Sequence, residues 1–389
     1  MESIAAQRIL YSQIRVMFDK AKKLEASGQK IIHLEIGRPD FNTPQHIVDA
    51  AIKALREGKH HYSQNAGILE FRQAVAEKYA AEHKLDYSPE TEVVITNGVA
   101  QGTYVAVHAL LNPGDQMLVP DPRWLNYDVD AFTNFVEPVE YTLYEDRGFQ
   151  PDPSEIRKKI TPRTKMIVLT SPSNPTGSVL ERSTLEQIAE LAIEHNLIVL
   201  SDEIYEKIIY PQARHTCMAV LPEMRQLTLV VNGVSKYYSM TGWRQGFILG
   251  PEKMMNPILR YHQYMITSTN TFAQWGAVEA LRGDQSPSMA MVEEFRKRRD
   301  FLYGAVNRIP GFKCAEPQGA FYLFPSIEET GMDGYQMADF LLEKAGVAAV
   351  AGECFGTNGA DHIRLSYANS MDNLKAAAEK MKEAIDGIR

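Results

Sequence analysis

Lys236 stands in the stretch VNGVSKYYSMTGWRQG, residues 231–246, directly after an apolar run and a serine, Ser235. Arg244 follows eight residues later and adds a planar cation that can bind a phosphate or a carboxylate through two hydrogen bonds. A lysine amine that loses its proton can form a Schiff base with an aldehyde. Lys236 is therefore either an ordinary solvated lysine or the covalent anchor of a carbonyl cofactor.

Two other polar side chains follow apolar runs. Asn174 lies in TSPSNPTG, residues 170–177, where a structural turn explains the proline and the glycine but not the asparagine. Asp202 lies in SDEIYEK, where a carboxylate after an apolar strand is costly unless it meets a cation or strong donors. The alternative for Asp202 is a solvated carboxylate at a strand end.

A third group is a main-chain site. The stretch VVITNGVAQGTYVAVHALL, residues 93–111, predicts a strand, a tight turn and a helix. The N–H groups of Val99, Ala100 and Gln101 fall in the first helical turn, so we expect them to be unpaired and able to bind an anion. A glycine turn without a ligand is the alternative, because such turns recur in α/β folds.

One molecule, pyridoxal 5'-phosphate (PLP), would use all these groups. Its phosphate suits the helix N-terminus together with Ser235 and Arg244, and its aldehyde suits Lys236. Asp202 would keep the pyridine nitrogen protonated, so that the ring accepts electrons. The phenolic oxygen would be bound by two side chains, Asn174 and Tyr205. Trp124, in PDPRWLNY, is the expected stacking partner of the ring, unless it is a core tryptophan.

The elements that must position these residues follow an alternating pattern. Short β-branched runs separated by helical patterns predict strands at residues 92–96, 116–120, 165–170, 197–203, 228–233 and 246–250. This alternation predicts an α/β fold with a mostly parallel central sheet covered by helices. Open sheets of this kind bind ligands at the ends of their strands, where the candidate residues lie.

The chain length of 389 residues favours two domains. We expect an N-terminal arm and part of a small domain in residues 1–45, a large cofactor-binding domain in 46–285 and the rest of the small α+β domain in 286–389. The last region begins with a charged helical pattern, continues with short strand-like pieces and closes with a helix rich in lysine and glutamate.

Composition excludes several other classes. The formal net charge of -8 offers no general attraction to nucleic acid or to an anionic membrane. The N-terminal segment lacks the features of a secretory signal, and no apolar run is long enough to span a bilayer. Three isolated cysteines, Cys217, Cys314 and Cys354, suggest neither a disulfide framework nor a metal site. We therefore expect a cytoplasmic enzyme without a metal.

The ordered motifs resemble those of a known family. From GRPDFNTP and HYSQNAGILEFR through NGVAQG, SPSNPTG and SDEIYE to SKYYSMTGWRQG, GAFYLF and HIRLSYA, the chain looks like a class I, fold-type I PLP-dependent aminotransferase. The resemblance is to the branch that contains the bacterial aspartate and aromatic aminotransferases, and it covers nearly the whole length. It implies transfer of an amino group from an L-amino acid to a 2-oxo acid, with 2-oxoglutarate as the expected acceptor.

The resemblance also implies residue roles. It gives Lys236 the aldimine with the cofactor and the proton transfer in two ping-pong half-reactions, and it gives Asp202 the pyridine nitrogen. The remaining expected cofactor ligands are Asn174, Tyr205, Trp124, Val99, Ala100, Ser235 and Arg244. Arg364, in HIRLSYA, is expected to bind the substrate α-carboxylate, with the Gly37 backbone and Asn174 nearby, rather than to form a surface ion pair.

The resemblance extends to assembly and departs from the family pattern at two positions. Tyr62, in HYSQ, matches a tyrosine that reaches the phosphate of the neighbouring subunit, which implies a homodimer with shared active sites. Ala100 stands where some relatives carry a lysine that binds a second carboxylate, and Arg38 replaces an acidic or neutral residue. We therefore expect a broad enzyme that accepts aromatic or other uncharged donors as well as, or better than, aspartate. Arg38 could restore the contact with a second carboxylate or simply pair with a neighbouring acid.

Three other functions are alternatives to transamination. A PLP-dependent lyase is the nearest alternative, because the cofactor stabilises any Cα carbanion and the protein decides its fate. A nicotinamide-dependent dehydrogenase would need a G-x-G-x-x-G turn, which no loop supplies. A ligand-sensing protein on the same scaffold would need a DNA-binding segment, and there is neither spare length nor a basic stretch for one.

Overall fold

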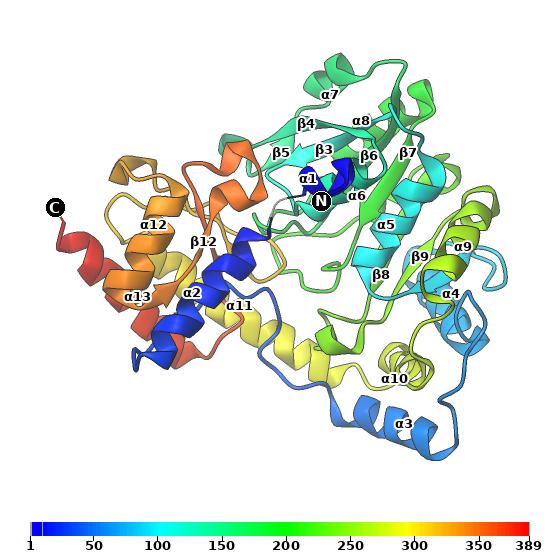
Figure 1. Cartoon of the computed structure of the whole chain (residues 1–389), viewed down its shortest axis with the longest axis horizontal. Helices are drawn as coiled ribbons and strands as arrows, with labels where there is room; N and C mark the ends of the chain where they lie inside the picture. Colours follow the sequence, from blue (N-terminus) through cyan, green and yellow to red (C-terminus); the bar gives the residue numbers. More distant parts are fainter. Residues whose placement is uncertain (1, 10, 389) are drawn as a thin grey trace.

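The computed structural model describes residues 2–9 and 11–388, so positions 1, 10 and 389 of the expected end segments lie outside it. Its largest sheet has eight strands in the order β2-β9-β8-β7-β6-β3-β4-β5 (Figure 1). The bounds are β2 Val93–Thr96, β3 Gln116–Asp121, β4 Glu137–Tyr144, β5 Gln150–Pro151, β6 Thr164–Thr170, β7 Ile198–Asp202, β8 Thr228–Gly233 and β9 Gly246–Leu249.

The predicted mostly parallel sheet is confirmed, with two differences. Strands β4, β3, β6, β7 and β8 run parallel to one another, whereas β9 is antiparallel to both of its neighbours and β5 is antiparallel to β4. The six predicted strands correspond to β2, β3, β6, β7, β8 and β9, and β4 and β5 were not predicted. Strand β4 was not recognised because its residues, EPVEYTLY, include a proline and two glutamates and so do not form a continuous apolar run.

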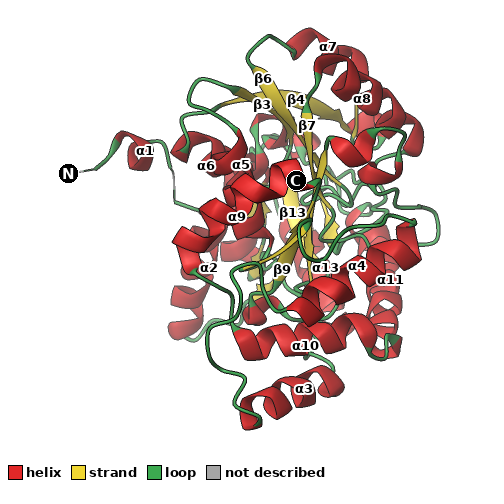
Figure 2. Ribbon diagram, turned by 90° about the vertical axis from the view of Figure 1, so that its right-hand side faces the viewer, coloured by secondary structure: helices red, strands yellow, loops and turns green. Residues whose placement is uncertain are grey.

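Helices cover both faces of this sheet, which explains why its central strands are apolar on both sides (Figure 2). One face packs against α5 Val99–Leu110, α6 Asn126–Thr133 and α9 Glu252–Ile266. The other face packs against α4 Leu69–His83, α7 Pro153–Lys159, α8 Arg182–His195 and α10 Thr271–Arg282. Alternate strand residues enter the two cores: Met166 lies on the first side and Ile167 on the second.

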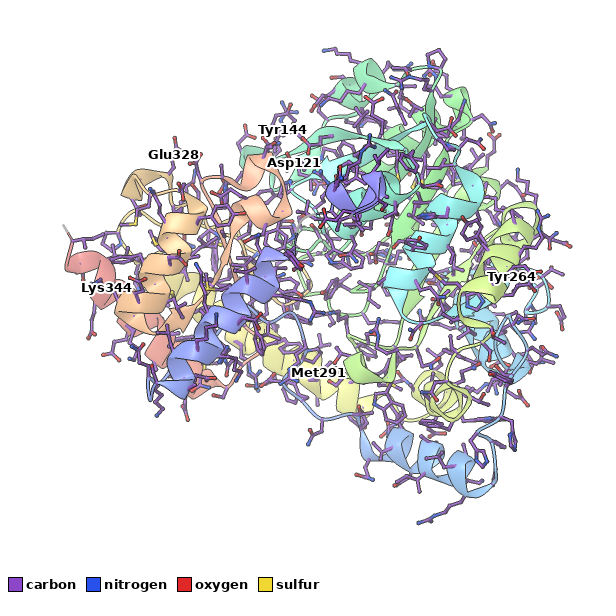
Figure 3. The ribbon with its side chains drawn as sticks, in the orientation of Figure 1. Asp121, Tyr144, Tyr264, Met291, Glu328 and Lys344 are labelled. Atoms are coloured by element: carbon purple, nitrogen blue, oxygen red, sulfur yellow. The ribbon has the colours of Figure 1, made fainter. Side chains whose placement is uncertain are left out.

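The two ends of the chain pack together beside this sheet. Strand β1 Ile32–His33 pairs in parallel with β11 Val347–Ala348, and β10 Tyr322–Leu323, β13 Ile363–Ser366 and β12 Val350–Ala351 form a second small sheet. The surrounding helices are α2 Gln13–Ala26, α11 Ser286–Val306, α12 Gly334–Phe340 and α13 Met371–Asp386, while α3 Gln45–Arg56 packs on α10 and the short α1 Ile4–Gln7 contacts α6. Glu328 and Lys344 mark this small end, and Tyr264 marks the opposite end of the molecule (Figure 3).

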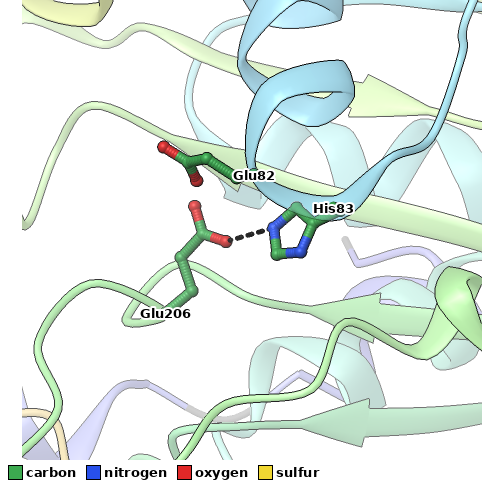
Figure 4. A group of neighbouring side chains, drawn as sticks. All are labelled: Glu82, His83 and Glu206. Atoms are coloured by element: carbon green, nitrogen blue, oxygen red, sulfur yellow. Dashed lines mark ion pairs between the residues drawn. The ribbon is translucent and has the colours of Figure 1, made fainter.

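A buried ion-pair network fixes the loop that follows β7. Glu206 accepts hydrogen bonds from the ammonium of Lys78 at 2.6 Å and the amide of Asn232 at 2.8 Å, and His83 lies 3.5 Å away (Figure 4). Lys78 also contacts Glu82 at 2.8 Å, so this lysine already supplies the positive charge that the carboxylates require. The network ties α4 to Glu206, which stands four residues after Asp202 and directly after Tyr205.

No helix in the described part of the chain combines the length and the apolar character that crossing a membrane requires.

Candidate active site

A cavity of about 880 Å³ opens at the carboxyl ends of β6, β7 and β8, next to the first turn of α5. This is the edge where open parallel sheets bind ligands, because the strand ends meet there and the loops diverge. All the residues predicted for the site except Tyr62 and Gln101 line this cavity: Gly37, Val99, Ala100, Trp124, Asn174, Asp202, Tyr205, Ser235, Lys236, Arg244 and Arg364. The structure thus brings together residues that are up to 327 positions apart, from Gly37 to Arg364.

Lys236 projects into this cavity from the turn after β8. Its ammonium donates a hydrogen bond of 2.7 Å to the carbonyl oxygen of Gly37 and lies 5.5 Å from the centre of the Tyr205 ring. Burial, together with the nearby charges of Arg364 and Arg244, lowers the pKa of Lys236 to about 8, although Asp202 opposes the shift. Near neutral pH, more of this amine is therefore unprotonated and nucleophilic than of an ordinary lysine.

Asp202 ends β7 and is 2% exposed. Its carboxylate accepts hydrogen bonds from the Tyr127 hydroxyl at 2.7 Å and from the backbone N–H of Ile204 at 3.1 Å. Burial raises the pKa of Asp202 to about 6 against the lowering effect of these donors. No cation of the described chain forms a salt bridge with this carboxylate, so it can receive one from a ligand.

Tyr127 and Trp124 form an aromatic pair beside Asp202. Their rings are 5.5 Å apart at an interplanar angle of 87°, and the Tyr127 hydroxyl also contacts the Thr170 hydroxyl at 2.9 Å. Trp124 was predicted from the sequence and Tyr127 was not. Tyr127 stands three residues after Trp124, in the first turn of α6. This spacing is the only sequence pattern that could have indicated that the two side chains lie on the same side.

The main-chain site lies where expected, at the start of α5. Gly98 caps the helix with φ of +76°, and a side chain at this position would collide with the guanidinium of Arg244. Val99 and Ala100 therefore present their N–H groups in the first turn, beside Arg244. The expectation for Gln101 was wrong, because its N–H donates to the Gly98 carbonyl oxygen at 3.2 Å as the turn tightens.

A pair of tyrosines lines the opposite wall. The hydroxyl of Tyr205 lies 2.8 Å from that of Tyr322, which sequence reasoning did not select although it stands in the quoted motif GAFYLF. Burial, strengthened by Tyr322, raises the pKa of Tyr205 well above its usual range. Tyr205 therefore keeps its proton near neutral pH and can donate a hydrogen bond to an oxyanion.

Arg364 is not a surface residue, since it is 2% exposed. It donates hydrogen bonds to the Asn174 side-chain oxygen at 2.9 Å and to the Glu35 carbonyl oxygen at 2.6 Å. Its Nε is buried and has no hydrogen-bond partner among the described residues. A buried guanidinium without a carboxylate partner is costly, and a ligand carboxylate would remove this cost.

Tyr62 lies outside the cavity and is 88% exposed. Its segment is fixed nonetheless: Thr271 donates a hydrogen bond to the His61 carbonyl oxygen at 2.6 Å, and Asn65 donates one to the Thr267 carbonyl oxygen at 2.7 Å. The tyrosine is thus displayed outward from an anchored loop.

The cavity fits PLP in three independent ways. It offers a buried carboxylate without a cation at Asp202, a glycine cradle at a helix N-terminus at Gly98 and a lysine of lowered pKa at Lys236. These groups match a protonated ring nitrogen, a phosphate and an aldehyde. No single one of them requires that ligand, but the combination suits it.

Replacing Asp202 should stabilise the cofactor-free protein. The pKa of Asp202 is raised from about 3.8 in the unfolded chain to about 6 in the folded one. The contribution of Asp202 to the stability of the fold is therefore complete only below about pH 3.8, and it is lost as the pH rises through about 6. Asp202→Asn should therefore raise the free energy of unfolding by about 3 kcal/mol at pH 8 and by about half of that at pH 5.

Urea unfolding at the two pH values measures this difference. Asp130→Asn is the control, because burial also raises the pKa of Asp130, to about 7, but Asp130 does not line the cavity. Both variants should show a gain that grows with pH, and only Asp202→Asn should weaken cofactor binding. If Asp202→Asn raised the free energy of unfolding by the same amount at both pH values, the conclusion that burial raises the pKa of Asp202 would be wrong.

Comparisons with known proteins agree with this geometry. A family model described as aminotransferase class I and II matches residues 29–381. An aspartate aminotransferase of Pyrococcus horikoshii is 40% identical, covering 98% of this chain and 97% of its own, and an aromatic-amino-acid aminotransferase of Thermococcus litoralis is 37% identical, covering 96% and 95%. The solved structure of an alanine aminotransferase from Pyrococcus furiosus superposes with a TM-score of 0.95 at 34% identity, covering 100% of both chains. The chain therefore belongs to the class I and II aminotransferase family and is a PLP-dependent aminotransferase.

Proposed function

We propose that this aminotransferase moves the amino group of a broad range of L-amino acids to 2-oxoglutarate, with Lys236 as the catalytic base. The observation that carries the proposal is the position of Lys236, with its pKa lowered to about 8, in one cavity with Asp202 and Arg364. A cation for the substrate carboxylate, a carboxylate for the cofactor ring and an amine for proton transfer are what the reaction requires.

The cofactor would be held at both of its ends. The first turn of α5, with Val99 and Ala100, would bind the phosphate together with Ser235 and Arg244. Asp202 would bind the ring nitrogen and keep it protonated. The residues that would contact the rest of the ring are Trp124 on its face and Asn174 and Tyr205 at its phenolic oxygen. Bound PLP supplies an aldehyde for amino groups and a ring that accepts the electrons released at Cα.

Lys236 would transfer the proton. Its unprotonated Nζ would take the Cα proton of the amino acid and pass it to C4' of the cofactor in the first half-reaction, and would move a proton from C4' to Cα of the second substrate in the reverse direction. Because burial and the neighbouring cations lower its pKa, the amine can accept this proton near neutral pH and release it again. Nζ donates a hydrogen bond of 2.7 Å to the Gly37 carbonyl oxygen, and this contact fixes the position of the amine before it reacts.

Arg364 would orient the substrate. Asn174 and the Glu35 carbonyl hold two of its nitrogens in place, and the buried Nε remains available to an α-carboxylate. With this carboxylate and the reacting amine fixed, the Cα proton faces Lys236. A lyase would use the same arrangement, but the named relatives are all aminotransferases, and no feature of the cavity favours elimination.

The donor range follows from two residues at the cavity wall. Ala100 cannot bind a second carboxylate, and Arg38 is exposed and forms no salt bridge with any described residue. An exposed cation of this kind contributes little to selectivity. The relatives named for aspartate, aromatic amino acids and alanine show how widely similar chains differ in donor, which is consistent with a permissive pocket here.

Assembly is a further part of the proposal. We infer a homodimer in which Tyr62 of each subunit contacts the phosphate site of the other, supported by the outward display of Tyr62 and by a second exposed tyrosine, Tyr264, at 91% exposure. We also infer that residues 46–285 form the large domain, that residues 1–45 form an N-terminal arm and part of the small domain, and that residues 286–389 form the rest of it. We infer as well that the enzyme works in the cytoplasm. The pairing of β1 with β11 supports the grouping of the two chain ends.

Lys236→Ala should abolish multiple turnover, by at least about 10³-fold, because Lys22, the other lysine that lines the cavity, lies on the outer wall and is paired with Glu25. The variant should still fold and bind PLP noncovalently through the phosphate site. Steady-state transamination and the absorbance of the bound cofactor measure the two properties. Near wild-type turnover in this variant would end the proposed mechanism.

Arg38→Ala should reduce the single-turnover rate with aspartate less than about fivefold and should leave phenylalanine, methionine and alanine unchanged. The control is Lys344→Ala, which removes an exposed charge far from the cavity. If wild type strongly prefers aspartate and the preference disappears with Arg38→Ala, the broad range is wrong and Arg38 binds the second carboxylate.

Mixing Lys236→Ala with Tyr62→Phe protomers should restore activity, because each hybrid dimer would hold one site with both native residues. The measurement is transamination after subunit exchange, compared with each impaired variant alone. Absence of recovery in confirmed hybrids would show that Tyr62 does not serve the neighbouring site.

A further inference from the structure

The helix α2 forms an outer wall of the active-site cavity. Arg15, Phe18 and Lys22 of this helix line the cavity, whereas only Met17 and Ala21 are buried beneath it. Such a small apolar contact holds a helix weakly, so polar contacts must contribute to its position. One exposed ion pair, between Lys20 and Asp339 at 2.7 Å, ties α2 to α12.

A second, less exposed contact ties α2 to β1. His33 of β1 places Nδ1 2.7 Å from a carboxylate oxygen of Glu35 and Nε2 2.9 Å from a carboxylate oxygen of Glu25, which belongs to α2. Only the imidazolium form carries an N–H on both nitrogens, so both carboxylates receive a hydrogen bond from His33 only when it is protonated. The contact with Glu35, assisted by Glu25 and opposed by burial, raises the pKa of His33 accordingly.

The same segment holds the two cations of the active site. Glu35 is fully buried, and its carbonyl oxygen accepts the hydrogen bond from Arg364 at 2.6 Å. Two residues later, the carbonyl oxygen of Gly37 accepts the hydrogen bond from Lys236. The Asn369 amide donates to the His33 carbonyl oxygen at 2.9 Å. A side chain that fixes this strand and α2 together therefore acts on both walls of the substrate pocket.

We propose that His33 is a positioning residue for amino-acid binding, which in its protonated form clamps α2 to β1 and to the segment after it, whose carbonyl oxygens contact Arg364 and Lys236. This inference rests on the proposed role of Arg364 in binding the substrate carboxylate. The charged groups around the clamp are Glu25 and Lys22 on α2, which are 2.7 Å apart, and Glu35 on the segment of His33 itself. Asn369, from the loop after β13, is neutral.

The sign of the pH dependence follows from the raised pKa. The clamp is complete below the ordinary imidazole pKa of about 6.5 and is lost as the pH rises through the higher value of folded His33. Substrate binding should therefore weaken on the alkaline side, whereas the clamp's contribution should be constant at acid pH.

His33→Gln tests the proposal, because glutamine cannot carry the charge. At pH 6 the KM for the amino donor should rise about tenfold while kcat changes less than twofold, and the ratio of variant to wild-type KM should approach 1 above pH 9. Amide hydrogen exchange in residues 13–26 of the variant should be faster at pH 6. Glu25→Ala, which changes a residue at the surface end of the clamp, should give the same effects, and the double variant should add little to them.

Asp339→Asn is the matched control, since it removes the other polar tie of α2 and should leave the pH dependence of KM unchanged. A KM ratio that stays constant between pH 6 and pH 9, or unchanged exchange of residues 13–26 in both clamp variants, would overturn the proposal. If wild type itself failed to transaminate, the proposed function would fail, whereas the exchange experiment would still report on the clamp.

Discussion

Asp202 and Arg364 are buried and Lys236 is partly buried in one cavity, without salt bridges to one another or to other described residues, and the rest of the structure depends on this arrangement. Three such charges lower the stability of the folded chain, because each loses hydration and no salt bridge compensates for the loss. The sheet brings two of them to a single edge by ending β7 and β8 side by side, and β13 brings the third from the other end of the chain.

The protein limits this cost in different ways for each group. Lys236 releases its proton more readily, with its pKa lowered to about 8, and Asp202 holds its proton longer, with a pKa of about 6. Tyr127 and the Ile204 N–H supply donors to Asp202, and Asn174 and Glu35 supply acceptors to Arg364. Each group is thus partly satisfied but still able to bind a ligand, which is the state that a cofactor site and a substrate site require.

Sequence patterns predicted much of this arrangement because the informative residues follow strands. The ends of β6, β7 and β8 could be recognised from apolar runs, so Asn174, Asp202 and Lys236 could be expected at one edge. Tyr322 and Tyr127 could not be placed, since the first reaches Tyr205 only through packing of the chain ends and the second through the turn of α6. The pairing of His33 with Glu25 and Glu35 depends on how α2 crosses β1, which no local pattern specifies.

We infer that Lys236 is the amine that holds the cofactor. The most direct experiment is to add PLP to the cofactor-free protein, reduce the mixture with borohydride and identify the modified peptide by mass spectrometry. We expect one pyridoxyl group per chain, on the peptide that contains Lys236, and no such label in Lys236→Ala. A label of equal yield on another lysine, or none on Lys236, would contradict this inference.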